Sequence, residues 1–160
     1  MTDDDFRKKF FELLDFTDNT FHPLLWINGE PEIGEDNHIG GFSGLNAQGA
    51  RLKIGNYCEI SSFVDINVAT SHRRTIGLTE ENECRDIIIG DYVFIGSHCF
   101  IMGGTRIGDR SVIGAGTIVR GDDIPPYSLV VGNPAVIKPG YYKKEFEAQG
   151  ILNSEDGASG

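Results

Sequence analysis

Four histidines could serve this chain as a general base, because imidazole is the side chain that exchanges a proton near neutral pH. They are His22, His38, His72 and His98. His72 opens a polar segment that runs from Ser71 to Asp86, so it can face a groove. His22 lies beside Pro23 and Trp26 and is expected to pack, whereas the other two are expected to point outward from a regular framework. Position therefore favours His72 as the group that deprotonates a hydroxyl or an amine.

Three cysteines are the candidate nucleophiles, namely Cys58, Cys84 and Cys99. Their number is odd and no CxxC pair occurs, which argues against a disulfide framework and against a zinc site. Cys58 and Cys99 fall on positions that the repeat described below turns inward, where a thiol behaves as a small hydrophobe. Cys84 has no adjacent histidine to activate it. We therefore expect neither a covalent intermediate nor a bound metal.

Composition excludes two classes of partner. The chain has 160 residues, enough for one domain, and 14 Lys+Arg against 24 Asp+Glu give a net charge of −10. With no basic run longer than a pair, it lacks the means to neutralise nucleic-acid phosphates. The first residues, MTDDDFRKKF, contain no apolar signal core, and no apolar run approaches the ~18 residues of a membrane span. We expect a cytoplasmic protein that binds neither nucleic acid nor membrane.

Aliphatic residues recur every six positions, a period that fits neither a helix nor a half-buried strand. The series is strictest over residues 89–119 and also occurs upstream: Ile33, Ile39, Leu45, Ile54, Ile60, Ile66, Ile89, Ile95, Ile101, Ile107, Ile113 and Val119. Glycine accounts for 21 of the 160 residues and often follows these aliphatic residues. We expect those glycines where the chain turns, often with positive φ and with no room for a Cβ.

The position two residues before each aliphatic residue supports the same unit. From Ile54 onward it is apolar or small: Leu52, Cys58, Val64, Ile87, Val93, Cys99, Thr105, Ser111 and Thr117. Because residues i and i−2 point to the same side of a strand, both sets should face one interior. Each unit is then a short strand and a corner, and three units make a triangular coil that stacks ~4.8 Å from the next through parallel ladders. The predicted fold class is all-β, a parallel β-helix.

The period breaks twice. Nine residues separate Leu45 from Ile54, and 23 separate Ile66 from Ile89. The second break predicts a loop over about 71–88 that protrudes from the coil. A single domain follows, with an N-terminal cap over 1–30, the β-helix over 31–138, a C-terminal helix over 139–150 and a tail over 151–160. Apolar spacing predicts helices over residues 6–16 and 141–149, the first of them capping the first coil, and residues 153–160 are expected to be disordered.

The segment IIIGDYVFIGSHCFIMGGTRIGDRSVIGAGTIVRGDDIPPYSLVVGNPAVIK, which begins at Ile87, resembles the core of the hexapeptide-repeat acetyltransferases. That group includes galactoside, maltose, xenobiotic and surface-sugar acetyltransferases. The resemblance extends over roughly residues 33–138. It implies a left-handed coil, a rare exception to the usual handedness of parallel connections. It also implies acetyl-CoA as co-substrate and a homotrimer with active sites between subunits.

The resemblance assigns roles to individual residues. The family places its base at the start of such a loop, after an extended stretch like Ala69-Thr70-Ser71-His72, so His72 is the expected base. Asp65 and Asn67 are expected to bind the acceptor or to orient the imidazole, with plain exposed polarity as the alternative. The pantetheine arm is expected to lie along the backbone at Gly96, Ser97, Gly114, Ala115, Thr117, Arg120 and Gly121, with Lys138 near the phosphates.

Two positions depart from the family pattern. Phe94 stands where tryptophan is common, which removes an indole N–H donor from the vicinity of the site. Val136 directly follows Pro134-Ala135, where a basic residue is usual, which removes one phosphate contact. Arg120 can compensate for that lost cation.

The predicted function is transfer of an acetyl group from acetyl-CoA to a hydroxyl or amino group of a small acceptor, a sugar or a nucleotide-linked sugar, by direct attack. Oxygen and nitrogen stay open as the acetylated atom. A zinc-dependent enzyme of the carbonic anhydrase type is one alternative, for which His72 and His98 could supply two of the three ligands that such a site needs. A non-catalytic assembly module is the other, but it would need neither the loop nor the IGAG segment.

Overall fold

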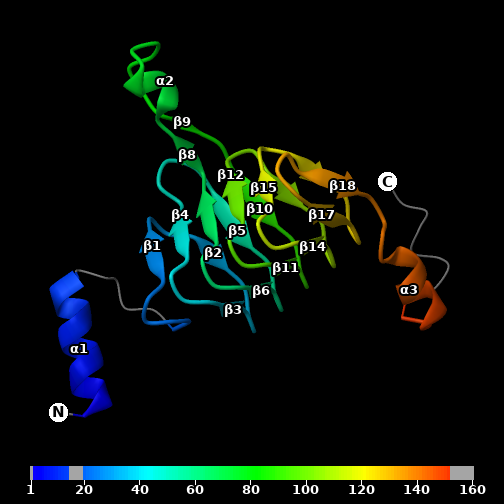
Figure 1. Ribbon diagram of the computed structural model, residues 1–160, viewed down its shortest axis with the longest axis horizontal. Helices are drawn as coiled ribbons and strands as arrows, with labels where there is room; N and C mark the ends of the chain where they lie inside the picture. Colours follow the sequence, from blue (N-terminus) through cyan, green and yellow to red (C-terminus); the bar gives the residue numbers. More distant parts are fainter. Residues whose placement is uncertain (1, 15–19, 152–160) are drawn as a thin grey trace.

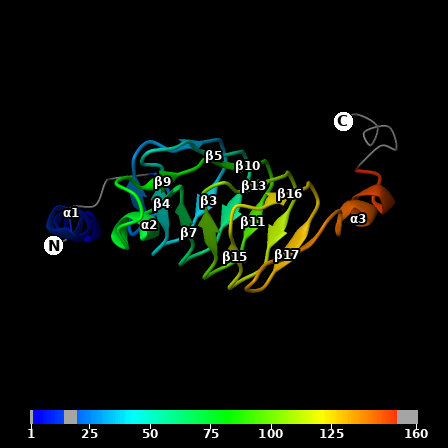
Figure 2. The ribbon, with the colours of Figure 1, turned by 90° about the horizontal axis from the view of Figure 1, so that it is seen from above.

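Short strands wind into a parallel β-helix in the computed structural model, which describes residues 2–14 and 20–151 (Figures 1 and 2). Successive strands fall on three sheets that form the faces of a prism. Face A contains β1 (Trp26–Asn28), β4 (Gly44–Asn46), β7 (Asp65–Asn67), β12 (Phe100–Met102) and β15 (Ile118–Val119). Face B contains β2 (Glu32–Ile33), β5 (Leu52–Ile54), β10 (Ile87–Ile89), β13 (Arg106–Ile107) and β16 (Asp123–Ile124). Face C contains β3 (His38–Ile39), β6 (Glu59–Ile60), β11 (Phe94–Ile95), β14 (Val112–Ile113), β17 (Leu129–Val131) and β18 (Val136–Lys138).

The aliphatic residues of the six-residue period pair with one another between successive coils. Ile60 pairs with Ile39 on one side and with Ile95 on the other, always in parallel strands. The predicted aliphatic residues from Ile39 to Val119 are at most 2 % exposed, which confirms that they fill one continuous interior. The single reversal of direction in these faces is β18, which runs antiparallel to β17.

The positions two residues earlier also face inward, as predicted. Leu52, Val64 and Val93 are each 1 % exposed, and the hydroxyls among these positions are buried as well. Each buried hydroxyl is hydrogen-bonded to a backbone carbonyl, for example Thr105 Oγ1 to Met102 at 2.7 Å and Ser111 Oγ to Pro125 at 3.1 Å. The polar positions of the C-terminal coils therefore avoid the cost of an unpaired buried group.

The glycines that follow the aliphatic residues are needed for close approach and not for positive φ. A Cβ on Gly96 would stand 2.6 Å from the backbone nitrogen of Ala115 in the next coil. The expectation of positive φ at these glycines was wrong, because the left-handed residue falls two positions later. It is usually not glycine: Asp36, Phe42, Tyr57, Phe63, Tyr92, His98, Arg110 and Tyr127.

Several of these left-handed corner residues stack on one another between coils. At the corner between faces C and A, Phe63 lies with its ring centroid 5.2 Å from Phe42 and 5.0 Å from His98. At the corner between faces B and C, Tyr57 and Tyr92 stack at 4.9 Å. Aromatic pairs contribute ~0.5–1.5 kcal/mol each, which offsets much of the ~1–2 kcal/mol that a left-handed residue costs.

A loop leaves the coil at the corner between faces A and B, which we call the A–B corner. It follows β7 and returns at β10 through a hairpin, β8 (Ala69–Thr70) against β9 (Glu83–Cys84), with α2 (His72–Thr75) above it. The loop projects away from the prism, as Figure 1 shows. The predicted protrusion is confirmed, except that β10 already begins at Ile87.

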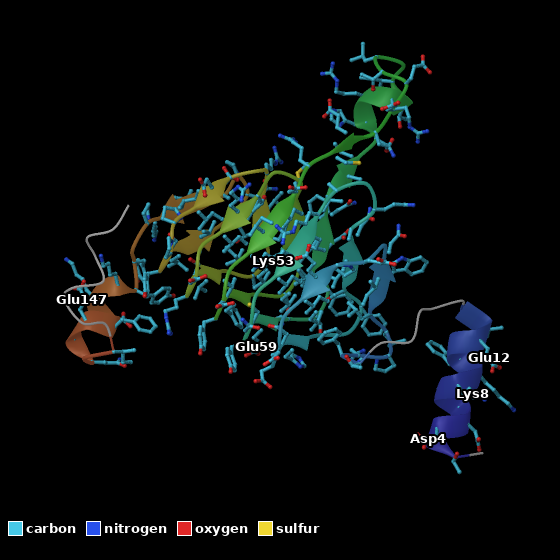
Figure 3. The ribbon with its side chains drawn as sticks, turned by 180° about the vertical axis from the view of Figure 1, so that it is seen from behind. Asp4, Lys8, Glu12, Lys53, Glu59 and Glu147 are labelled. Carbon is cyan, nitrogen blue, oxygen red and sulfur yellow. The ribbon has the colours of Figure 1, made fainter. Side chains whose placement is uncertain are left out.

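Helices lie at both ends of the solenoid (Figure 1). α1 (Asp3–Leu14) lies beyond the first coil, and Figure 3 shows Asp4, Lys8 and Glu12 following one another along it. α3 (Lys143–Ala148) lies at the other end, where Phe146 packs edge-on against Tyr127 at 5.4 Å. Two predictions lie outside the described residues. They are the last two residues of the first helix, 15 and 16, and the disordered tail over residues 153–160. None of the helices in the described part of the chain has the length and apolarity to cross a membrane.

Candidate active site

His72 is the first residue of α2, above the β8–β9 hairpin of the protruding loop, and is exposed to solvent. Its Nδ1 lies 2.9 Å from Oγ1 of Thr70, the last residue of β8. Thr70 is itself held opposite Glu83 in the hairpin, and the Nε of Arg73 forms an ion pair with that carboxylate at 3.1 Å. The imidazole is therefore fixed through one ring nitrogen, and Nε2 has no hydrogen-bond partner among the described residues.

A cavity of about 260 Å³ lies at the foot of this hairpin, and we call it the hairpin pocket. Thr70 and Ser71 line it next to the histidine, and β12 supplies an apolar floor through Phe100 and Met102. The remaining lining residues come from both ends of the loop and the coil below: Asn67, Val68, Ala69, Glu83, Arg85 and Gly103. His72 is not itself among the lining residues, but it directly follows Ser71 and is hydrogen-bonded to Thr70, which both line the pocket.

Asn67 is oriented by two hydrogen bonds to its amide oxygen. Oδ1 accepts from Asn46 Nδ2 at 3.0 Å and from the backbone nitrogen of Ala69 at 2.9 Å. Because both bonds use the oxygen, the Nδ2 amino group is left as a donor toward the pocket. Asn67 is thus placed where a substrate-binding residue would stand.

Asp65 lies on the same strand as Asn67 but borders a different cavity. That second cavity, of about 560 Å³, is largely aromatic and is lined by Phe10, Leu24, Trp26, Phe42, Ser43, Gly44, Phe63, Val64 and Asp65. These apolar neighbours desolvate the Asp65 carboxyl and raise its pKa above the ordinary value. The structure therefore separates Asp65 and Asn67, which the sequence pairs as substrate-binding residues.

The residues predicted for the pantetheine arm divide between two corners of the prism. Gly96, Ser97, Gly114 and Ala115 lie between faces C and A, whereas Arg120 and Gly121 lie at the A–B corner below the loop. Face A lies between these two corners. One chain therefore does not bring all of these residues to one place.

The remaining predicted residues differ in what they can offer. Thr117 is fully buried, its hydroxyl donates to the Gly114 carbonyl at 2.6 Å, and its backbone nitrogen and oxygen are bonded within the coil, so it offers a ligand no free group. Lys138 is exposed on β18, with its Nζ 5.8 Å from the Tyr141 ring centroid. Arg120 is exposed too, and its Nη2 lies 3.4 Å from Asn133 Oδ1.

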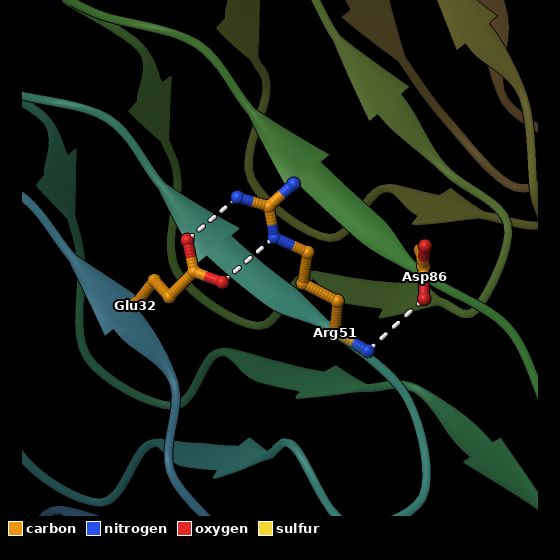
Figure 4. Close-up of polar contacts among 3 residues, drawn as sticks. All are labelled: Glu32, Arg51 and Asp86. Carbon is orange, nitrogen blue, oxygen red and sulfur yellow. Dashed lines mark hydrogen bonds and ion pairs between the residues drawn. The ribbon is translucent and has the colours of Figure 1, made fainter.

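A bidentate ion pair fixes the return of the loop to the coil (Figure 4). Arg51 donates from Nε and Nη2 to the two carboxylate oxygens of Glu32, each at 2.7 Å. The backbone nitrogen of Arg51 donates to Asp86 Oδ1 at 3.0 Å, directly before β10. The hydrogen bond from Arg51 lowers the pKa of Glu32. These contacts link three successive coils, those of β2, β5 and β10, at the point where the loop returns to face B.

The other histidines and the cysteines fit the roles predicted for them. His22 accepts a hydrogen bond from the Leu24 nitrogen at its Nδ1, and His38 is exposed on face C. Cys58 and Cys99 are 2 % exposed, and burial raises the pKa of both thiols. The described residues include no group of three or more His, Cys, Asp or Glu side chains arranged to hold a metal ion.

Sequence reasoning missed Arg85 and the floor of the hairpin pocket. Arg85 is the second-last residue before β10, so it stands at the foot of the hairpin, one residue beyond the Ala69–Cys84 pair. Its backbone nitrogen donates to the Val68 carbonyl at 2.9 Å. No local signal in the sequence singles it out, because the loop carries other arginines and the hairpin that positions Arg85 is not visible in the hexapeptide period.

A family model described as bacterial transferase hexapeptide (six repeats) matches residues 86–121. Among solved structures, a hexapeptide-repeat-containing acetyltransferase from Vibrio cholerae is 30% identical, covers 71% of this chain and 70% of that chain, and has a TM-score of 0.51. Galactoside acetyltransferase in complex with coenzyme A is also 30% identical, over 76% of this chain and 66% of that chain, with a TM-score of 0.53.

Chloramphenicol acetyltransferase of Escherichia coli is 34% identical over 101 residues, which cover 61% of this chain and 48% of the relative. The chain spans about half of that relative and a quarter of the Staphylococcus aureus relatives, which it matches at 49% identity over 51 residues. The coil is the left-handed parallel β-helix that the resemblance implied. By its repeat register and these matches, the chain belongs to the hexapeptide-repeat family of bacterial transferases.

Proposed function

We propose that the protein transfers an acetyl group from acetyl-CoA to a hydroxyl or amino group of a small acceptor, a sugar or a nucleotide-linked sugar, with His72 as general base. The observation that carries this proposal is the hydrogen bond between Thr70 and His72 at the edge of the hairpin pocket. It ties the imidazole to a residue that lines a cavity of the size that a small acceptor needs, at the loop that interrupts an otherwise regular coil.

The base requires one tautomer of the imidazole. Nδ1–H donates to Thr70 Oγ1 at 2.9 Å, and this leaves the lone pair of Nε2 free to take a proton. The threonine hydroxyl thus has the role of a positioning group, as a carboxylate or carbonyl has behind other catalytic histidines.

The proposed reaction is a single displacement through a tetrahedral intermediate. His72 Nε2 takes the proton from the acceptor hydroxyl or amine as its oxygen or nitrogen bonds to the thioester carbonyl carbon. The intermediate collapses with cleavage of the C–S bond, and the imidazolium returns the proton to the leaving thiolate. The buried thiols of Cys58 and Cys99 favour this direct path, because neither is accessible to form an acyl-enzyme.

The coenzyme fits surfaces where the corner residues are small. Ala115 is exposed, and a Cβ on the adjacent Gly116 would meet nothing within 4 Å, so an extended arm can lie against the backbone there. Because this corner and the A–B corner lie on opposite edges of face A, we propose a homotrimer. In it, the A–B corner of one copy would face the corner between faces C and A of the next.

The relatives support the class of reaction. Galactoside acetyltransferase, which is similar over three quarters of this chain, was solved in complex with coenzyme A. Its name also supports a sugar acceptor. The zinc alternative would need three clustered ligands, and no observation among the described residues favours it.

Thiol release tests the proposal. The protein is incubated with acetyl-CoA and a panel of hydroxyl and amino sugars, free and nucleotide-linked, and free coenzyme A is measured against acceptor-free controls. We expect acceptor-dependent release that His72→Gln abolishes. A panel that leaves the release rate at the acceptor-free level, while the protein also fails to bind coenzyme A, would favour the assembly module.

A further inference from the structure

We infer that the hairpin pocket recognises an acceptor that carries a carboxylate near the acetylated group. This inference rests on the proposed function and names the substrate class for the same site. The lining of the pocket includes two side chains that can donate hydrogen bonds to an anion, Asn67 and the permanently charged Arg85, in a chain whose net charge is −10.

Arg85 supplies the positive charge. Arg85 lines the pocket, and its guanidinium has no ion-pair partner within the ranges that the structure describes. The side chain extends along the A–B corner, where its Nη1 lies 3.5 Å from the place that a Cβ on Gly104 would occupy and 3.9 Å from that on Gly121. The guanidinium therefore lies along the bare backbone of this corner.

The single acid in the lining is already neutralised. Glu83 is paired with Arg73 from the loop above, at 3.1 Å. The charge that a ligand meets is therefore that of Arg85. A planar guanidinium binds a carboxylate through two parallel N–H···O bonds, which gives this pairing geometric as well as electrostatic preference.

Asn67 adds a second donor. Its oxygen is committed to Asn46 and Ala69, so the amino group is the part that can meet the ligand. Phe100 and Met102 form an apolar floor on which the carbon face of a ring can lie. An acidic sugar matches this combination of two donors, a flat apolar surface and a nearby imidazole.

The phosphates of the coenzyme are the other possible source of anionic oxygens. The thioester must lie at the His72 imidazole, and the whole pantetheine arm separates it from the phosphates. Thr70, which touches His72, and Arg85 line one pocket of only about 260 Å³. The anion at Arg85 is therefore close to the reacting group, which assigns it to the acceptor.

The experiment uses glucuronate and galacturonate, each compared with its uncharged amide. Binding is measured by ligand-observed NMR without acetyl-CoA, and turnover by thiol release with it. Wild type, Arg85→Gln and Arg106→Gln are compared, because Arg106 is exposed on β13 and removes the same charge outside the pocket. We expect kcat/KM and affinity to favour the acids by ~10- to 100-fold in wild type and in Arg106→Gln, and Arg85→Gln to lose that preference.

The outcomes separate this inference from the proposed function. Equal binding and turnover of acids and amides in wild type overturns the inference, and the proposed function then stands on whatever sugars release thiol. Binding that depends on Arg85 without thiol release supports the pocket and counts against the acetyl transfer. A rise in the KM for acetyl-CoA in Arg85→Gln, equal with acid and amide, would place the guanidinium on the coenzyme and overturn the inference.

Discussion

Thr70 Oγ1 lies 2.9 Å from His72 Nδ1, and both residues belong to the loop that leaves the coil at the A–B corner. The threonine is fixed by the β8–β9 hairpin, so the orientation of the imidazole depends on the hairpin and not on the solenoid itself. The hairpin thereby orients a side chain that lies outside the solenoid.

Replacing His72 tests the base directly. We expect His72→Ala to keep the fold and to lower kcat by roughly 10²–10⁴-fold, the usual loss of a general base. His38→Ala, on the exposed surface of face C, is the matched control and should keep wild-type turnover. Circular dichroism checks the fold and thiol release the rate. Turnover within a few-fold of wild type in folded His72→Ala protein would remove His72 from the mechanism.

Replacing Thr70 tests the positioning hydrogen bond. Thr70→Val keeps the shape and removes the hydroxyl, and we expect kcat to fall by ~5- to 10-fold with an unchanged KM for acetyl-CoA. Thr70→Ser should restore the rate. If valine and serine behave alike, the hydroxyl has no role in orienting the imidazole.

Asp65 predicts a pH dependence of stability. Desolvation raises its pKa in the folded protein, so ionisation costs more in the folded than in the unfolded state. Its contribution is most favourable below the unfolded pKa and is lost as pH rises through the folded pKa. We expect Asp65→Asn to raise Tm relative to wild type near pH 7 and not near pH 3. Asp123→Asn, exposed on face B, is the control, and a Tm gain that is equal at both pH values would contradict the assignment.

The inward cysteines should matter for stability and not for chemistry. Their Sγ atoms lie 3.2 Å (Cys58) and 3.1 Å (Cys99) from the carbonyl oxygens of Gly90 and Gly114. Cys58→Ser and Cys99→Ser should each cost roughly 1–3 kcal/mol in the free energy of unfolding, measured with denaturant. Lost turnover with an unchanged unfolding curve in either variant would restore a covalent mechanism.

The division of site residues between two corners predicts complementation between copies. Light scattering should give about three times the 17.5 kDa chain mass. Co-expression of His72→Ala chains with Ala115→Trp chains, each inactive alone, should leave about a quarter of shared sites with both partners intact. Ala115 is exposed, so the larger side chain is tolerated in the monomer. Mixed preparations as inactive as either parent would show that one chain forms the whole site.

The coil was predictable because its interior repeats. Where the period is unbroken, each ladder pairs like residues three units apart, as Ile95 pairs with Ile113, so the period in the sequence sets the register in space. The position of His72 followed from the one long break in that period. The left-handed aromatic corners did not follow, because local preference disfavours them and stacking between coils decides.

The arrangement around the site was less predictable. Asp65 and Asn67 are two residues apart and point the same way, yet neighbours from other coils place them at different cavities. Arg85 was counted as part of a polar loop, because nothing local distinguishes it from Arg73 or Arg74. Only the hairpin brings it next to Thr70.

The reversed strand β18 determines where the solenoid stops. A parallel ladder on face C would accept one more coil, but β18 pairs with β17 in the opposite direction and ends the winding. The number of coils is therefore set by this terminator and not by the repeat, which makes coil number a variable that evolution or an engineer can change. Duplicating three consecutive units between the A–B corner loop and β17 would lengthen the rod by one coil spacing, ~4.8 Å, and would leave the loop and the terminator unaltered.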